Sequence, residues 1–345
     1  MFVRSISLAV LAFGPALMAR PLTGQAAPAA YHVTRHIPVA GDGGWDYVTF
    51  DTARSRLFIA RSTRVQVVDA NSGQLVGEIP NTGGVHGVAL AYGLGKGYTS
   101  NGRDTTVTVF DFVSLEPTKT IHVTGAGPDG ILFDSATSRV FTFNGHGQSA
   151  TAIDAVGDTV VGTIPLGGKP EAAVSDGKGN IFVNIEDRST IVEFDAAHLT
   201  ILHTYPIAPC EEPSGLAMDQ AHHLLFAGCR NKVMAIIDAN TGRVLSTPVS
   251  DAGTDANAFD PVTGIAFSSN GAGTLTLVTH PTPGTFVSEN IPTARGARTM
   301  ALDPKTHRVY LVTAAFGPPP AATPAQPRPR PSMIPGSFEV LVVGR

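Results

Sequence analysis

The chain has 345 residues, of which 43% are hydrophobic and 15% charged, and it carries a formal net charge of −4. This composition is typical of a globular protein and not of a disordered one. The acidic excess, and the absence of any basic run, argue against nucleic acid as a partner, because binding to phosphates needs a clustered positive surface. The 37 glycines and 26 prolines, among apolar runs rich in Val, Ile, Thr and Phe, favour short strands joined by turns.

The N-terminal segment has the features of a secretory signal peptide. Arg4 supplies a positive start, an apolar stretch runs from Ile6 to Ala19, and small residues around Ala27 to Ala30 offer cleavage sites. We therefore expect residues 1–29 to be a signal peptide and the mature protein to be periplasmic or secreted. The apolar stretch is short for a membrane span and no later segment is longer, so we expect no transmembrane segment after its removal. An uncleaved anchor is the alternative.

A phrase is repeated along the chain. "VVDANSGQLVGEIP" at 67–80 returns as "IIDANTGRVLSTPV" at 236–249. Between them an aspartate recurs in steps of 41 to 43 residues, at Asp69, Asp111, Asp154, Asp195 and Asp238. A second series keeps the same period, with one aspartate replaced by Ala91, at Asp51, Asp134, Asp176, Asp219, Asp260 and Asp303. Two series with one period identify a repeat protein.

Each repeat reads as four short strands, named a to d, separated by Gly, Asp, Asn and Ser turns. This is the content of one β-propeller blade. Seven units can be counted, beginning near Gly43 and ending with one near Ala294. The sequence therefore predicts an all-β fold, a single seven-bladed propeller of four-stranded antiparallel blades over residues 31–345. The seventh unit lacks an outer strand, and "YHVTRHIPVA" (31–40) resembles one, so we expect the N-terminal strand to close blade 7 and protect its edges.

Several strand phrases resemble a known family. "GYTSN" (97–101), "IFVNIE" (181–186) and "VYLVT" (309–313), together with "VVDANSGQLVGEIP", are similar to the bacterial YVTN-type β-propeller repeat proteins, over nearly all of the chain from residue 31. WD40 and kelch repeats fit less well, because Trp45 is the only tryptophan and the period is shorter than that of kelch. The resemblance implies an exported propeller of unassigned role. More distantly it extends to propellers that act as lactonases or metal-dependent lyases, and fold alone does not choose among these.

Ionisable residues recur where the chain leads into strand a. In a propeller these loops share one face, the channel mouth, with the loops between strands b and c. Five residues before the strand-a aspartate, the seven blades carry Asp46, His86, Asp129, Glu171, Ser214, Asp255 and Arg298, which we call the mouth ring. All of these except Ser214 are candidate ligand-binding residues. Asp129, Glu171 and Asp255 are candidate ligands of a divalent cation, and His86 is a candidate general base. The alternative is solvated charge at a water-filled mouth.

Two other features fall on the same face. The b–c loops carry basic residues expected to rim the mouth, namely Arg61, Arg64, Arg103, His146, Arg188 and Arg230. Recurrent Asn-Gly pairs in these loops predict turns with positive φ. The b–c loop of blade 7 is long and proline-rich over residues 317–335, and such a segment is extended and stiff. It is expected to be a lid over the channel, a docking strip for a partner, or a solvated insertion.

Cys210 and Cys229 are the only cysteines. Cys210 precedes strand a of blade 5 and Cys229 ends strand b of the same blade, so both fall at one end of it. In an exported protein this arrangement predicts a disulfide, with two free thiols or metal ligation as alternatives.

No catalytic motif is present: the sequence has no G-x-S-x-G, H-E-x-x-H or C-x-x-C-H. The sequence therefore leaves open whether the protein is an enzyme. We favour an exported, monomeric scaffold that binds a small molecule or a protein partner through its mouth face. The alternative is a metal-assisted hydrolase or lyase acting on a small polar substrate such as a lactone, with His86 as base and a divalent cation as the one cofactor suggested.

Overall fold

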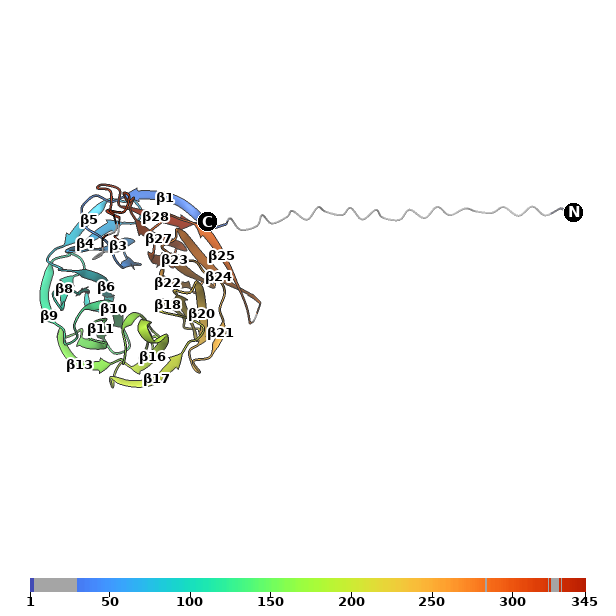
Figure 1. Cartoon of the computed structure of the whole chain (residues 1–345). Helices are drawn as coiled ribbons and strands as arrows, with labels where there is room; N and C mark the ends of the chain where they lie inside the picture. The colour runs from blue at the N-terminus through green and yellow to red at the C-terminus, as the bar shows by residue number, and fades with distance from the viewer. Residues whose placement is uncertain (3–29, 283, 322, 324–328, 330) are drawn as a thin grey trace.

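The computed structural model describes residues 1–2, 30–282, 284–321, 323, 329 and 331–345. The expected signal peptide, residues 1–29, falls almost entirely outside this part of the chain. The described residues form seven four-stranded antiparallel sheets arranged as blades around a central channel (Figure 1). The predicted fold, a seven-bladed propeller, is confirmed. No helix in the described part of the chain has the length and hydropathy needed to cross a bilayer.

Blades 1 to 3 follow one another along the chain, and within each blade the strands lie side by side in sequence order. Blade 1 contains β2 (Val48–Asp51), β3 (Arg56–Arg61), β4 (Arg64–Asp69) and β5 (Leu75–Ile79). Blade 2 contains β6 (Val85–Ala91), β7 (Lys96–Asn101), β8 (Thr106–Asp111) and β9 (Pro117–His122), with the 3-10 turn η1 (Tyr92–Leu94) after β6. Blade 3 contains β10 (Pro128–Asp134), β11 (Arg139–Asn144), β12 (Ser149–Asp154) and β13 (Thr159–Pro165).

Blades 4 to 6 repeat this order. Blade 4 contains β14 (Pro170–Ser175), β15 (Asn180–Ile185), β16 (Thr190–Asp195) and β17 (Thr200–Pro206), with η2 (Glu186–Arg188) after β15. Blade 5 contains β18 (Pro213–Asp219), β19 (Leu224–Cys229), β20 (Val233–Asp238) and a short outer strand, β21 (Val244–Ser246). Blade 6 contains β22 (Thr254–Asp260), β23 (Ile265–Asn270), β24 (Thr274–Thr282) and β25 (Thr285–Pro292).

Blade 7 contains both the first and the last strand of the described chain. Its strands lie in the order β26 (Thr299–Asp303), β27 (Arg308–Thr313), β28 (Glu339–Gly344) and β1 (His32–Pro38). β1 pairs antiparallel with β28, from His32 opposite Gly344 to Pro38 opposite Glu339. The N-terminal strand therefore supplies the missing outer strand and closes the ring, as the sequence predicted.

The recurring aspartates stabilise turns on the face opposite the mouth. At the end of a strand a, the fully buried Asp134 accepts hydrogen bonds from Thr137 N (3.0 Å) and Thr137 Oγ1 (2.6 Å). At the end of a strand c, Asp111 accepts from Val113 N (2.9 Å) and Ser114 N (2.7 Å). These backbone hydrogen bonds lower the pKa of Asp111. The two periodic series are therefore turn-forming residues, not site residues.

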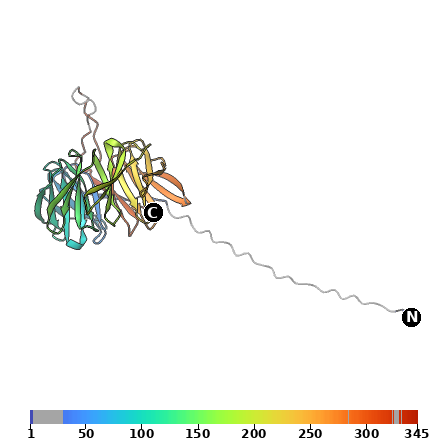
Figure 2. The ribbon, with the colours of Figure 1, turned by 90° about the horizontal axis from the view of Figure 1, so that it is seen from below.

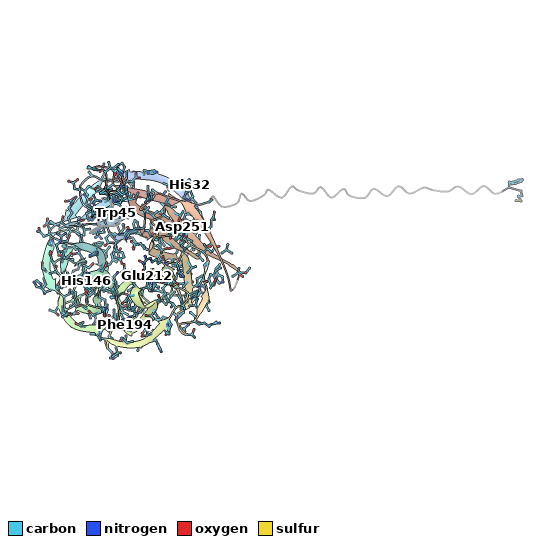
Figure 3. The ribbon with its side chains drawn as sticks, viewed as in Figure 1. His32, Trp45, His146, Phe194, Glu212 and Asp251 are labelled. Atoms are coloured by element: carbon cyan, nitrogen blue, oxygen red, sulfur yellow. A yellow bond between two sulfur atoms is a disulfide. The ribbon has the colours of Figure 1, made fainter. Side chains whose placement is uncertain are left out.

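The hydrophobic core lies between blades. Seven clusters of buried apolar side chains occur, one at each contact between neighbouring blades, and the side chains fill the space between the sheets (Figure 3). Phe58 of blade 1, for example, packs on Phe110 of blade 2 with ring centroids 5.9 Å apart. Because every blade is covered on both sides, the ring is rigid and holds its inner strand ends in fixed positions.

The Asn-Gly pairs serve a different purpose from the one predicted. Asn101, at the end of β7, is buried and donates from Nδ2 to Thr106 Oγ1 (3.1 Å) and Thr108 Oγ1 (2.9 Å), tying strand b to strand c. The glycine that follows, Gly102, does not have a positive φ; Thr105 does, at 53°. The prediction of positive φ at the Asn-Gly pairs was therefore wrong. In this turn the residue with positive φ is Thr105, three residues after the glycine.

Candidate functional site

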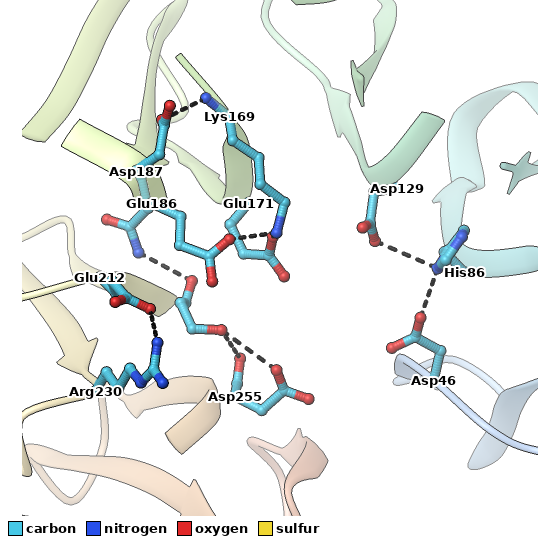
Figure 4. Close-up of polar contacts among 12 residues, drawn as sticks. Asp46, His86, Asp129, Lys169, Glu171, Glu186, Asp187, Glu212, Arg230 and Asp255 are labelled. Carbon is cyan, nitrogen blue, oxygen red and sulfur yellow. Dashed lines mark hydrogen bonds and ion pairs between the residues drawn. The ribbon is translucent and has the colours of Figure 1, made fainter. Parts of the chain in front are cut away.

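The mouth ring brings residues from different blades face to face. Each member lies at or just before the start of a strand a, so the blades place the seven side chains around the channel. Figure 4 shows Asp46, His86 and Asp129 facing one another, with Glu171 and Asp255 on other sides of the opening. Burial, together with the negative charge of other ring members, raises the pKa values of Asp129, Glu171 and Asp255.

His86 lies between two carboxylates. Its Nδ1 is 2.6 Å from Asp46 Oδ2 and 3.5 Å from Asp129 Oδ1. The three side chains are 33%, 26% and 23% exposed, and each offers one ligand atom within 4.8 Å of the others. An imidazole nitrogen with two carboxylate oxygens is a donor set that binds divalent transition metals. This group, Asp46, His86 and Asp129, is the candidate cation site.

The pKa values of His86 and Asp129 depend on burial and on the charges of their neighbours in this group. Burial opposes the charged form of His86, but the hydrogen bond to Asp46 and the negative charge of Asp129 outweigh it and raise the His86 pKa. Burial also raises the pKa of Asp129, which His86 lowers and Asp46 raises further. A bound cation would place positive charge beside the same two carboxylates.

Glu171 is the most perturbed carboxyl of the ring. Burial, then the charge of Asp129, raises its pKa to about 8, although Lys169 acts in the opposite direction. Its Oε2 is buried without a hydrogen-bond partner, and Lys169 Nζ lies 3.5 Å away while it donates to Glu186. Glu171 therefore holds a proton at neutral pH unless positive charge enters the mouth.

Asp255 lies beside the cationic member of the ring. Arg298 Nη1 is 3.2 Å from Asp255 Oδ2, and Ser214 Oγ donates to Asp255 Oδ1 at 3.3 Å. Burial raises the pKa of Asp255 to about 6, against the charge of Arg298. The ring thus has three of its four carboxylates in blades 1 to 4, and an ion-paired side, formed by Asp255 and Arg298, in blades 6 and 7.

The cation ligands expected from sequence are not gathered into one cluster. Of Asp129, Glu171 and Asp255, Asp129 alone belongs to the group with His86, and Asp46 takes the third place. Glu171 pairs with Lys169, and Asp255 pairs with Arg298. The role of each candidate residue, including His86 as a base, stays a prediction.

Tyr47 is a site residue that the sequence analysis did not single out. It follows Asp46, and the corresponding positions of the other blades hold small residues, namely Gly87, Gly130, Ala172, Gly215, Ala256 and Thr299. Tyr47 and most of these residues line a channel cavity of 170 Å³. Burial, then Glu171, Asp129, Asp46 and Asp255, raises the pKa of Tyr47. One large residue among six small ones was the available signal.

Gly102 leaves room for the His86 imidazole. A Cβ at this position would lie 2.6 Å from His86 Nε2 and 3.2 Å from the carbonyl oxygen of Pro128. The corresponding Gly145, in the next blade, has no atom closer than 3.7 Å to such a Cβ. Gly102 therefore positions His86, which gives the first Asn-Gly pair a purpose beyond its turn.

The basic rim differs from the expectation at Arg61. This side chain is fully buried, with its guanidinium 3.6 Å above the centroid of the Phe338 ring and its Nη2 donating to Gly41 O at 2.8 Å. Burial, with the charge of Arg64, lowers its pKa to about 10. Arg61 stays charged at neutral pH but packs inside the fold instead of lining the mouth.

The predicted disulfide is present. Cys210 and Cys229 are bonded, 19 residues apart in sequence. The bond holds the segment before β18, where Glu212 pairs with Arg230, at the mouth face. A disulfide is consistent with an oxidising compartment.

The proline-rich segment leaves the mouth face as a paired stem, visible as the brown ribbon in Figure 2. Gly317 N donates to Ser332 O (2.9 Å) and Ile334 N donates to Ala315 O (2.8 Å). Phe316 contacts Trp45, with ring centroids 5.9 Å apart, and Met333 packs against the core between blades 7 and 1. The base of this segment is therefore part of the packed structure.

Comparison with known proteins identifies the fold class and no more. No protein-family model and no curated protein matches the sequence, so membership of the YVTN-type family stays a prediction. Among solved structures, the chain is similar to a chain of Kuenenia stuttgartiensis hydrazine synthase, with 16% identity, a TM-score of 0.71, and coverage of 79% of this chain and 94% of that one.

Two further solved structures show the same likeness. A chain of the mitotic checkpoint complex has 15% identity and a TM-score of 0.72, covering 89% of this chain and 96% of that one. The U3-55K structure has 11% identity and a TM-score of 0.73, covering 89% of this chain and 97% of that one. At these identities the likeness shows a seven-bladed propeller, a class commonly used as a binding scaffold.

Proposed function

We propose that this protein is an exported binding propeller whose mouth holds a divalent cation, through Asp46, His86 and Asp129, together with a small ligand of that cation. The observation that carries the proposal is the placement of His86 between two carboxylates, with three ligand atoms within 4.8 Å of one another. The raised pKa values of Asp129 and Glu171 support it, because burial, and then the charge of neighbouring carboxylates, disfavours their ionised forms and a bound cation would offset both effects. The disulfide supports the exported location.

The test is cation binding by the mature chain, purified without chelator. Native mass spectrometry and calorimetry with Mn²⁺, Zn²⁺ and Ca²⁺ are expected to give one bound ion per chain. His86→Ala and Asp129→Asn each remove a ligand, and we expect affinity to fall more than about 100-fold. His146→Ala is the matched control, because His146 is an exposed histidine on the same face and outside the group. Equal affinity in all variants, or no bound ion with any of the three metals, would rule out the proposal.

A second candidate function, metal-assisted hydrolysis or elimination, is favoured by one observation. The pKa of Glu171 is raised to about 8 in the cation-free protein, so this carboxyl is a candidate proton donor in the mouth. A bound cation would lower that pKa toward neutrality. In lactone hydrolysis, water would add to the carbonyl carbon, the ring C–O bond would break, and the alkoxide would take up a proton to give a hydroxy acid. A pH-stat assay on γ-butyrolactone with Mn²⁺ tests this. Turnover lost in both Glu171→Gln and Asp129→Asn would support it, and no turnover above buffer would exclude it for this substrate class.

A further inference from the structure

A hollow of 420 Å³ opens beside the ion-paired side of the mouth ring, and we call it the mouth pocket. It is lined by Trp45, Arg295, Gly296, Arg298, Phe316 and Pro331, with two more glycines. Arg298 belongs both to this pocket and to the mouth ring, where it pairs with Asp255. A second hollow of 620 Å³ shares Arg295, Phe316 and Pro331 with it. The volume of the mouth pocket is in the range of small-molecule sites.

The apolar wall of the mouth pocket is fixed by a stack of side chains. Phe316 contacts Trp45, and Trp45 contacts Phe338, with ring centroids 5.9 and 5.3 Å apart. The buried Arg61 guanidinium lies on Phe338 and is held by Gly41 O. Because this stack continues into the core between blades 7 and 1, the aromatic wall is in place before any ligand binds.

Glycine keeps the pocket open. Gly296 has a φ of +86°, where a side chain would be strained, and a Cβ there would lie 3.2 Å from the Phe316 ring. Gly44 and Gly271 line the same hollow. A side chain at Gly296 would reduce the space in front of the Phe316 ring.

The polar groups of the pocket are cationic. Arg295 is exposed, and within the described ranges no ion pair holds its guanidinium. The Arg298 side chain is 47% exposed and has one ionic contact, at Nη1. A guanidinium has five N–H donors in a planar fork that fits a carboxylate. Two such groups beside an aromatic wall match a ligand that is both apolar and anionic.

We infer that the mouth pocket binds an organic carboxylate with a flat apolar body. The body packs against Trp45, Phe316 and Pro331, and the carboxylate accepts hydrogen bonds from Arg295 and Arg298. This inference names the small ligand of the proposed function and rests on it in one respect: the carboxylate is taken to be the group that lies toward the cation at the mouth ring. The stem of the proline-rich segment is then a wall of a ligand site.

The chain reports on this pocket itself, because Trp45 is its only tryptophan. The experiment titrates 3-phenylpropionate, its neutral analogue 3-phenylpropanamide and the cationic 3-phenylpropylamine, with tryptophan fluorescence excited at a wavelength these compounds do not absorb. We expect saturable change with the carboxylate and at least about tenfold weaker binding of the amide, since a hydrogen bond to a charged group is lost. No saturable change with the carboxylate, or equal affinities for all three compounds, would overturn the inference.

Variants separate this inference from the cation site. Arg295→Gln and Phe316→Ala are each expected to weaken carboxylate binding about tenfold, while Arg188→Gln, an exposed arginine on the same face, is the control. Neither pocket variant should change Mn²⁺ affinity. Carboxylate binding that persists in Asp129→Asn without metal would uphold the pocket even if the cation site fails. If the protein binds a cation but not 3-phenylpropionate, the cation site is supported and the inference about the mouth pocket is wrong.

Discussion

Asp255 and Asp260 lie five residues apart on the same strand, β22, and have opposite surroundings. Asp260, on the face away from the mouth, is fully buried and accepts from Val262 N (3.0 Å), Thr263 Oγ1 (2.8 Å) and His307 Nδ1 (2.7 Å). Asp255, at the mouth, has one arginine and a long hydrogen bond from Ser214, and its pKa is raised to about 6.

The difference extends around the ring. On the far face the carboxylates are satisfied by their own turns, and the pKa values of Asp69, Asp111 and Asp195 are lowered. At the mouth, Asp129 and Glu171 are partly buried, Glu171 Oε2 has no hydrogen-bond donor, and the pKa values of both residues are raised. A carboxylate whose hydrogen bonds are complete stabilises the fold, whereas one without them is available to a ligand.

The largest expected effect is on stability at the far face. The Asp260 carboxylate accepts from the backbone N–H groups of Val262 and Thr263, from the Thr263 hydroxyl and from His307 Nδ1. Asp260→Asn weakens these hydrogen bonds and should lower the free energy of unfolding by about 2 kcal/mol. Asp255→Asn is the matched variant on the same strand and should lose little stability at pH 7. Urea denaturation of both measures the difference. Equal losses of unfolding free energy in the two variants would contradict the distinction between the two faces.

The next effect is the pH dependence of the mouth. The pKa of Glu171 is 4.5 in an ordinary setting and about 8 in the folded protein, so the folded state keeps a proton that the unfolded state loses. The free energy of unfolding should therefore fall as pH rises from about 4.5 to about 8. Glu171→Gln removes this loss and should gain about 1 to 2 kcal/mol at pH 9, with little change at pH 4. Denaturation curves at both values check it, and parallel profiles for the two proteins would contradict it.

A related effect is the stabilisation by metal. Cations bind the ionised carboxylates, so the shift in melting temperature on adding Mn²⁺ should be larger at pH 8.5 than at pH 5.5. Asp129→Asn should abolish the shift at both values. A shift that is larger at the lower pH would show that the metal binds elsewhere.

The smallest effect concerns a residue that touches no ligand. Gly102→Ala should push the His86 imidazole out of place and weaken cation binding about tenfold. Gly145→Ala, in the equivalent turn, where a Cβ would meet no atom closer than 3.7 Å, is the control and should bind as the wild type does. Calorimetry on the pair measures the difference, and identical affinities would show that Gly102 does not position His86.

The fold could be predicted from sequence because its signals are local and repeated. The aspartates recur in fixed steps, and the outer strand missing from blade 7 is visible at residues 31–40. The arrangement at the mouth could not be predicted in the same way. Which side chains of the mouth ring contact one another depends on how neighbouring blades twist. Asp46 therefore lies beside His86 and Asp129, whereas Glu171 lies beside Lys169 and Asp255 beside Arg298.

The mouth pocket could not be predicted from the sequence for the same reason. Trp45 and Phe316 are 271 residues apart and meet only because the ring closes between blades 7 and 1. Arg61 is the opposite case, a residue predicted to be exposed that is buried. Its place in a polar loop predicted contact with solvent, but in the fold it packs on Phe338. Periodicity identifies equivalent positions, and the contacts between blades decide what each position does.

The pairing of β1 with β28 also sets the order in which the molecule can be completed. β1 is made first, and its partner strand, Glu339–Gly344, is made about three hundred residues later. Until then, β1 and the outer side of β27 are unpaired strand edges, which are prone to associate with other chains. A chain whose synthesis halts before residue 339 would hold six finished blades and still expose both edges. Ring closure therefore cannot occur before residues 339–344 have been made, and chains interrupted earlier would be candidates for aggregation and proteolysis.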